Sequence, residues 1–104
     1  MRLLFASLVF LLSFLCAKAQ TTLILDANFE QDLIDQGIDT NGVSGDILDT
    51  DAQAITNLTL GGTAITDITG IEAFVNLTDL DLGNNLIANV DLTALTQLVN
   101  FTTD

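Results

Sequence analysis

The fold is decided by ITNLTLGGTAITDITGIEAFVN, residues Ile55 to Asn76, because the chain then repeats it as LTDLDLGNNLIANVDLTALTQ, Leu77 to Gln97. A third copy opens with LVNFTTD, Leu98 to Asp104. The two complete copies are 22 and 21 residues long, and each begins apolar-x-x-apolar-x-apolar. A repeat of this length buries its apolar side only against its neighbours, so the pattern predicts a stacked solenoid.

Each copy is expected to contribute one short strand to a parallel sheet. Residues alternate along a strand, so the leucine-type positions point into the core and the intervening ones lie on the solvent side. The exposed ladders are predicted to be Asn57, Asp79 and Asn100; Thr59, Asp81 and Thr102; and Gly61, Gly83 and Asp104. The return segments are predicted to bring inward Ile65, Ile68, Ile71 and Phe74, and then Ile87, Val90, Leu92 and Leu95. Asn85 follows a predicted strand, where its side chain can hydrogen-bond backbone groups that the turn leaves unpaired. Thr63 occupies the equivalent position of the first repeat and can do so only more weakly.

Upstream of the repeats, the sequence predicts a helix over about residues 28–36. Asn28 is a favoured N-cap, and Gln31 three residues later fits a capping box. Gly37 suits the left-handed position that ends a helix, and Ile38 can fold back toward Leu33. Such a helix would cover the open apolar end of the solenoid, since terminal caps keep repeat stacks soluble.

An acidic, turn-rich segment, DTNGVSGDILDTDA, follows at residues 39–52. The spacing of Asp39, Asn41 and Asp51 is similar to a calcium loop, because calcium prefers hard oxygen ligands around a glycine turn. One residue too many lies between Asn41 and Gly45, and Asp51 stands where a glutamate is usual. The alternative is a solvated loop whose Asp and Gly residues serve only as turn formers.

Residues 1–19 have the pattern of a secretory signal peptide. Arg2 is followed by an apolar run that is too short for a comfortable membrane span, and Ala17-Lys18-Ala19 offers small residues for cleavage. The expected mature chain starts at Gln20 and is secreted or displayed at the cell surface. Two alternatives stay open: an uncleaved anchor, and a lipoprotein with lipid on Cys16.

Removal of that segment leaves an unusually acidic chain. No lysine, arginine, histidine or cysteine follows Lys18, while all 14 Asp and Glu residues remain. Nothing can therefore neutralise phosphates, which excludes nucleic acid and an anionic membrane surface as direct partners. No disulfide is available, and the carboxylates repel one another unless salt, a bound cation or a basic partner screens them.

The composition also argues against an enzyme. Ser44 is the only serine of the mature chain, and it has no histidine as a base. Asp79 and Asp81 are a carboxylate pair, but two repeats make no deep cleft and no Trp or Tyr is present to hold a sugar. The Asn-x-Thr sequons at Asn57, Asn76 and Asn100 are interpreted as a recurring part of the repeat pattern rather than as glycosylation sites.

The segment ITDITGIEAFVNLTDLDLGNN resembles the internalin-type leucine-rich repeat, and together with NFEQDLIDQGIDT it is similar to secreted leucine-rich-repeat proteins of certain Gram-negative bacteria. The resemblance spans roughly Ile24 to Asn100. It implies an α/β leucine-rich-repeat solenoid with short parallel strands on the concave face and an amino-terminal helical cap. The expected division is signal peptide 1–19, cap 20–54 and repeats 55–104, split as 55–76, 77–97 and a partial 98–104. Many more repeats usually follow in that family, so the chain is expected to be a fragment.

The function expected from these features is a secreted or cell-surface, non-catalytic protein-binding module. Its binding surface would be the concave face, formed by Asn57, Thr59, Asp79, Asp81, Asn100 and Thr102, with a basic or cation-bridged partner. The alternative is a structural cap of a longer array with no ligand of its own, with or without calcium. Leu95, Leu98 and Phe101 are expected to lack a covering neighbour, so the carboxy-terminal end should fray or associate.

Overall fold

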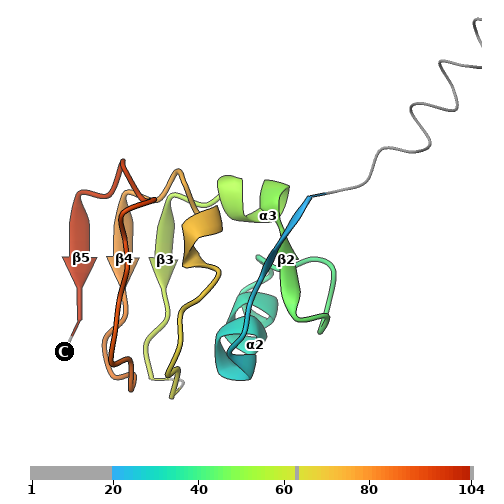
Figure 1. Ribbon diagram of the computed structural model, residues 1–104, viewed down its shortest axis with the longest axis horizontal. Helices are drawn as coiled ribbons and strands as arrows, with labels where there is room; N and C mark the ends of the chain where they lie inside the picture. Colours follow the sequence, from blue (N-terminus) through green and yellow to red (C-terminus); the bar gives the residue numbers. More distant parts are fainter. Residues whose placement is uncertain (1–19, 63, 104) are drawn as a thin grey trace, which may run out of the picture.

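The computed structural model describes residues 20–62 and 64–103, which form a short stack of repeats closed at one end by a cap (Figure 1). The predicted signal peptide 1–19, with Cys16, lies outside the described residues, as do Thr63 and Asp104. The cap holds a two-stranded sheet, and the repeats hold a three-stranded sheet of order β3-β4-β5. No helix of the described part is long and apolar enough to cross a membrane.

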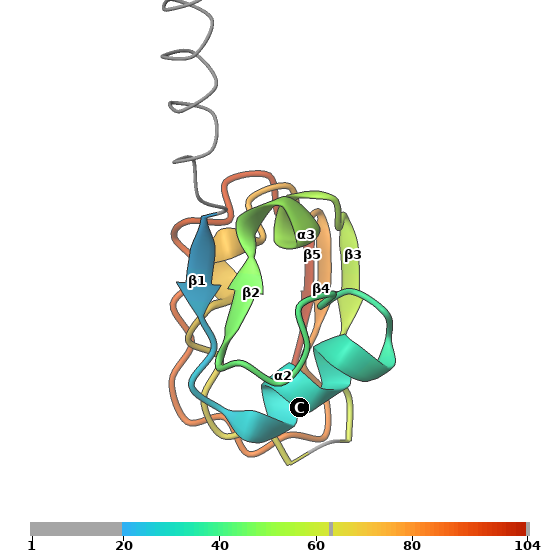
Figure 2. The ribbon, with the colours of Figure 1, turned by 90° about the vertical axis from the view of Figure 1, so that its right-hand side faces the viewer.

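The cap begins with an antiparallel pair of strands. β1 (Thr21–Leu23) pairs with β2 (Asp46–Leu48), with Thr22 opposite Ile47. Between them in sequence runs helix α2 (Ala27–Asp35). Figure 2 shows these three elements together in front of the stacked repeats, which lie behind them in that view.

Helix α2 starts one residue earlier than predicted, and its N-cap is Asp26 rather than Asn28. The Asp26 carboxylate accepts hydrogen bonds from the amides of Asn28 and Phe29, at 2.8 and 3.2 Å. The Asn28 side chain instead donates to the Ala64 carbonyl. Gln31 does not complete a capping box, because its amide donates to the Asp35 carboxylate one turn later.

The end of α2 is as predicted. Gly37 has φ of 76°, in the left-handed region that glycine adopts without strain. The Gly37 amide donates to the Ile34 carbonyl and the Ile38 amide to the Leu33 carbonyl, both at 2.9 Å. These two bonds are the Schellman pattern, and Ile38 packs back against the core.

The acidic segment 39–52 is more regular than a turn-rich loop. Its second half forms β2 and then the short helix α3 (Asp49–Gln53). Ile47 is fully buried and belongs to the hydrophobic core. Local composition favoured turns here, but pairing with β1, distant in sequence, converts Asp46–Leu48 into a strand.

The repeats supply the parallel sheet in the predicted register. β3 (Asn57–Thr59), β4 (Asp79–Asp81) and β5 (Asn100–Thr102) lie side by side, with Leu58 opposite Leu80 and Leu80 opposite Phe101. A 3-10 turn, η1 (Ile71–Ala73), forms in the first return segment.

Asn85 acts as predicted in the turn that follows β4. Its side-chain oxygen accepts from the Ile65 amide at 3.1 Å, and its side-chain nitrogen donates to the carbonyls of Leu60 and Leu82. One side chain thus joins the backbones of two successive repeats. It supplies hydrogen-bond partners to backbone N–H and C=O groups that the turn would otherwise leave unpaired.

One continuous core joins the cap to the repeats. Phe29 of α2 and Phe74 of the first return segment are fully buried, with ring centroids 6.5 Å apart. Gly70 (φ 112°) allows Ile24 to approach its backbone: a Cβ there would lie 2.2 Å from Ile24 Cδ1 and 2.7 Å from the Leu23 carbonyl oxygen.

The core thins toward β5. Of the return positions predicted to face inward, Val90 is 39% exposed, because no third return segment packs over it among the described residues. Phe101 is 40% exposed and Leu98 is half-buried, whereas Leu95, which was expected to lack cover, is buried at 4% exposure. Leu95 belongs to the second repeat and is part of the continuous core.

Candidate functional site

The concave face is the solvent side of the β3-β4-β5 sheet, and it brings together the six polar residues selected from the sequence. The register aligns Asn57 with Asp79 and Asp79 with Asn100. It aligns Thr59 with Asp81 and Asp81 with Thr102 in the same way. The six line a shallow hollow of about 100 Å³ whose floor is Leu58 and Leu80.

The concave face is rich in hydrogen-bond acceptors and carries negative charge. Asp79 and Asp81 are half-buried in the middle of the row, while the outer residues of the two ladders are exposed. The Asn100 side chain donates to the Asp79 carboxylate at 2.5 Å, and Asp81 accepts from the Gly83 amide at 2.8 Å. These bonds fix the positions of the two carboxylates. The face carries no positive group, so it is complementary to hydrogen-bond donors and cations.

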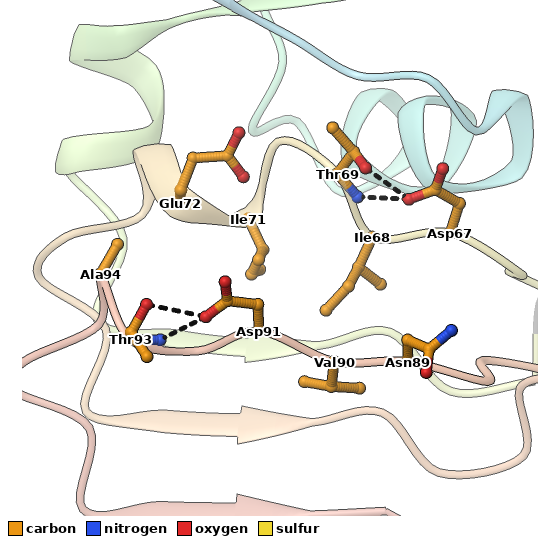
Figure 3. A pocket seen from close by; sticks show the side chains of 10 residues that line it. All are labelled: Asp67, Ile68, Thr69, Ile71, Glu72, Asn89, Val90, Asp91, Thr93 and Ala94. Atoms are coloured by element: carbon orange, nitrogen blue, oxygen red, sulfur yellow. Dashed lines mark hydrogen bonds between the residues drawn. The ribbon is translucent and has the colours of Figure 1, made fainter.

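Sequence reasoning missed a larger hollow, a groove of about 530 Å³ between the return segments of the two repeats (Figure 3). We call it the lateral groove. Its apolar part is Ile68, Ile71, Val90 and Ala94, and its polar part is Asp67, Thr69, Glu72, Asn89, Asp91 and Thr93. The lateral groove therefore combines apolar side chains with carboxylates, whereas the side chains that project from the concave face are polar.

Two identical Asp-x-Thr motifs build the polar part of the lateral groove. The Thr69 hydroxyl and amide donate to Asp67 at 2.6 and 2.8 Å, and those of Thr93 donate to Asp91 at 2.7 and 3.1 Å (Figure 3). These hydrogen bonds lower the pKa of both carboxyls, which keeps them charged at neutral pH. The recurrence of Asp-x-Thr in successive repeats was the signal in the sequence.

The three residues of the predicted calcium loop lie at the side of the cap. Asp39 is buried, whereas Asn41 is exposed and Asp51 is half-buried at the start of α3. The Asp51 carboxylate accepts from the Thr40 amide and hydroxyl, at 3.0 and 2.7 Å, so the two ends of the loop are joined. Within the described ranges, no three His, Cys, Asp or Glu side chains are placed to hold a metal ion by themselves.

The comparisons with known proteins identify the fold family. Residues 53–98 match the family described as Leucine Rich repeats (2 copies). The structure is similar to an internalin, InlF, from Listeria monocytogenes, with a TM-score of 0.65 and 26% identity over 78% of this chain. It is also similar to the functional domain of InlJ from the same species, with a TM-score of 0.62 and 28% identity over 84% of this chain.

The chain carries an internalin-like leucine-rich-repeat domain. A third similar structure is that of the CBM51-2 and INT domains of ZmpB from Clostridium perfringens, with a TM-score of 0.65 and 27% identity over 80% of this chain. The chain covers only 24%, 21% and 17% of the three solved chains. No curated protein is significantly similar in sequence.

This internalin-like domain has the α/β solenoid architecture that the repeat period predicted. The InlJ domain is described as including a cysteine ladder. The sequence here has its one cysteine at Cys16, outside the described residues, so no such ladder can form in the repeats. Contacts between these repeats rest instead on backbone pairing, the buried leucines and the Asn85 side chain.

Proposed function

We propose that the chain is an exported, non-catalytic protein-binding module that uses its concave face. The observation that carries the proposal is the alignment of six polar side chains in two ladders that flank the buried Leu58 and Leu80. A rigid sheet of this kind presents side chains in fixed positions, so little conformational entropy is lost on binding. Leucine-rich-repeat domains generally bind proteins, which supports the class of partner.

The partner's contact surface should be basic. Asp79 and Asp81 stand at the centre of the concave face, and the chain has no lysine, arginine or histidine after Lys18 to balance them. Electrostatic complementarity then raises the association rate and selects against acidic partners. The face also lacks Trp, Tyr and Arg, the residues that most often dominate binding energy, so a fragment of this size should bind weakly and lose affinity in salt.

The test is a paired charge-neutral substitution. Proteins from the extracellular medium would be captured on the immobilised mature chain, and the affinity of the enriched partner would be measured by biolayer interferometry. The double variant Asp79→Asn/Asp81→Asn should weaken binding about tenfold, equivalent to about 1.4 kcal/mol. The control Asp67→Asn/Asp91→Asn removes the same charge from the lateral groove and should leave binding unchanged. The opposite result would assign binding to the lateral groove.

A second candidate, a structural cap of a longer array, is favoured by the asymmetry of the two ends. The cap covers the side of β3, whereas β5 exposes Phe101 and an unpaired strand edge among the described residues. The similar solved chains are several times longer than this one. If no concave or lateral-groove variant alters capture of any partner, and appended repeats raise the stability, the capping role is the better account.

A further inference from the structure

The lateral groove is a second surface of the repeats, and the proposed binding function does not use it. The Leu86 amide donates to the Ile65 carbonyl at 2.9 Å, which joins the two repeats at the start of their return segments. Beyond that bond, no backbone hydrogen bond joins residues 66–76 to residues 87–98, all of which the structure describes. The space of about 530 Å³ between them is within the range of ligand sites, roughly 300–1,000 Å³.

The floor of the lateral groove is apolar and partly exposed. Ile68 and Ile71 belong to the continuous core and are only 4% and 2% exposed. Val90 is 39% exposed and Ala94 is exposed, so water contacts the apolar surface that the second repeat contributes. In Figure 3 the side chains of Ile68 and Ile71 project from the first return segment toward the second. An apolar side chain from a partner would displace water from this floor, which is favourable.

Three exposed carboxylates surround this floor, and each has one oxygen to offer a partner. Asp67 and Asp91 each accept through Oδ1 from the threonine two residues on. Glu72 accepts the Gly70 amide through Oε2 at 2.8 Å. The second oxygen of each carboxylate accepts no hydrogen bond from the described residues. Figure 3 shows Asp67 on one side of the Ile68 side chain and Glu72 on the other, so negative charge flanks the apolar centre.

The charge of the lateral groove restricts what can occupy it. No lysine, arginine or histidine follows Lys18, so neither another segment of the domain nor a second copy of it can neutralise the three carboxylates. A nucleic acid or an anionic membrane surface would be repelled. A small hydrated cation would leave the apolar floor in contact with water. The occupant that matches both properties of the groove is a protein segment with basic and apolar side chains.

We propose that the lateral groove binds an extended, basic segment of a partner protein, with one aliphatic side chain over Ile68 and Val90 and basic side chains two positions before and after it. Side chains at i, i+2 and i+4 share one face of an extended chain. The central one therefore reaches the floor while the outer two reach the carboxylates on either side. Exposed ion pairs contribute little each, so the aliphatic side chain supplies the selectivity, and the expected Kd is on the order of 1 mM.

This inference goes beyond the proposed function, because the lateral groove and the concave face share no residue. The concave hollow is only about 100 Å³, and Leu58 and Leu80 at its floor are each 2% exposed, so an aliphatic side chain gains little contact there. The same segment should therefore prefer the lateral groove. A partner captured through the concave face is a separate ligand, and loss of either activity leaves the other in place.

The test uses the isotope-labelled mature chain and short peptides with capped ends, followed by amide NMR. The probe Arg-Ser-Leu-Ser-Arg should shift the amides of Ile68, Ile71 and Val90 with saturation, and leave those of Leu58 and Leu80 in place. Arg-Ser-Ser-Ser-Arg keeps the charge but lacks the aliphatic side chain, so it should bind about tenfold more weakly. Glu-Ser-Leu-Ser-Glu reverses the charge and should not bind.

Matched variants test the two parts of the groove separately. Asp67→Asn/Asp91→Asn should weaken binding of the leucine peptide about tenfold and reduce its dependence on salt. Asparagine keeps an oxygen that can accept the threonine bonds, so the local turns are retained. Val90→Thr is similar in shape but adds a hydroxyl, so it should weaken the leucine peptide and not the serine peptide. The control Asp32→Asn/Asp35→Asn removes the same charge from α2 and should bind like the parent.

Three results would overturn the proposal. One is equal affinity for the leucine and serine peptides, or for spermine, because charge alone would then explain the binding. Another is a set of saturating shifts at Leu58 and Leu80 instead of Ile68 and Val90, which would assign the peptide to the concave face. The third is the absence of saturable shifts at about ten times the expected Kd. That third result leaves capture by the concave face unaffected, so failure here and failure of the proposed function are separate outcomes.

Discussion

Replacing Asp26 by alanine should loosen the junction between cap and repeats more than any other single change to a surface carboxylate. One oxygen of Asp26 caps α2 through the amides of Asn28 and Phe29. The other accepts the Thr66 amide at 2.8 Å, the Thr66 hydroxyl at 3.0 Å and the Asp67 amide at 3.1 Å. One carboxylate thus joins the start of α2 to a repeat segment 40 residues later.

The magnitude follows from these two sets of bonds. Loss of an N-cap costs about 1 kcal/mol. Hydrogen bonds to a charged acceptor contribute about 1.5–3 kcal/mol each when buried. Asp26 is half-exposed, so water can replace part of the lost hydrogen bonding in the variant. The three bonds to the repeat should therefore contribute about 1–2 kcal/mol together. The expected loss of unfolding free energy is about 2–3 kcal/mol, which lowers Tm by roughly 10–20 °C.

Urea unfolding followed by circular dichroism would measure the loss, with Asp35→Ala as the control. Asp35 is exposed and lies at the last turn of α2, where a negative charge opposes the helix dipole, so its removal should not destabilise. Asp26→Asn should fall between parent and Asp26→Ala, because an amide keeps one acceptor oxygen. The reasoning fails if Asp26→Ala stays within about 0.5 kcal/mol of Asp35→Ala.

The pH dependence gives an independent check. Partial burial would raise the pKa of Asp26, but hydrogen bonds from Thr66, Phe29 and Asp67 outweigh it and lower the pKa below its usual value. The folded pKa is therefore below the unfolded one, and the stabilisation is present above about pH 4 and lost as pH falls through the folded pKa. The difference between parent and Asp26→Ala should be constant at neutral pH and shrink below that point. A difference that grows in acid would show that the hydrogen bonds do not favour the charged form.

Other substitutions test the packing of the repeats. Gly70→Ala should cost about 2–4 kcal/mol, since its φ is 112° and its Cβ would lie 2.7 Å from a β1 carbonyl oxygen. Gly62→Ala, at φ 74° in open space, should cost only about 1 kcal/mol, and equal losses in urea unfolding would refute the close-approach argument. Asn85→Ala should cost about 2 kcal/mol by removing the bonds between two repeats, and an unchanged urea midpoint would contradict this. Phe101→Ser should reduce self-association in sedimentation velocity, because Phe101 is 40% exposed beside the open edge of β5, and a parent that stays monomeric at high concentration would argue against that edge as a contact.

Much of the repeat architecture could be predicted because it follows from local periodicity. The alternation around Leu58 and Leu80 determines which side chains reach solvent, and the stacking of copies determines the strand register. The role of Asn85 could be predicted for the same reason. The exposure of Val90 could not be predicted, because periodicity indicates which side faces the core but not whether a neighbour covers it.

The errors in the cap come from contacts between distant parts of the chain. Asp26 and Asn28 are both favoured N-caps, and nothing local distinguishes them. What distinguishes them is the first repeat, which donates the Thr66 amide to Asp26 and accepts the Asn28 side chain at Ala64. The lateral groove was missed for a similar reason, because each Asp-x-Thr motif is an ordinary turn until stacking places two of them along one groove.

The way the fold tolerates its acidity is visible in the carboxylates themselves. None of the described carboxylates has a basic side chain to pair with, and most accept backbone amides: Asp67 and Asp91 accept amides two residues on, and Asp81 accepts the Gly83 amide. At Asp67 and Asp91 the threonine hydroxyl and the amide together lower the pKa of the carboxyl, which favours the ionised form without a lysine or arginine. Long-range repulsion between these groups is left to ionic screening, so added salt should stabilise the domain as a whole. Asp39 is the exception among the described residues, because one of its oxygens is buried and meets no donor. Screening by solution ions cannot offset the cost at that oxygen, because its burial keeps ions away from it.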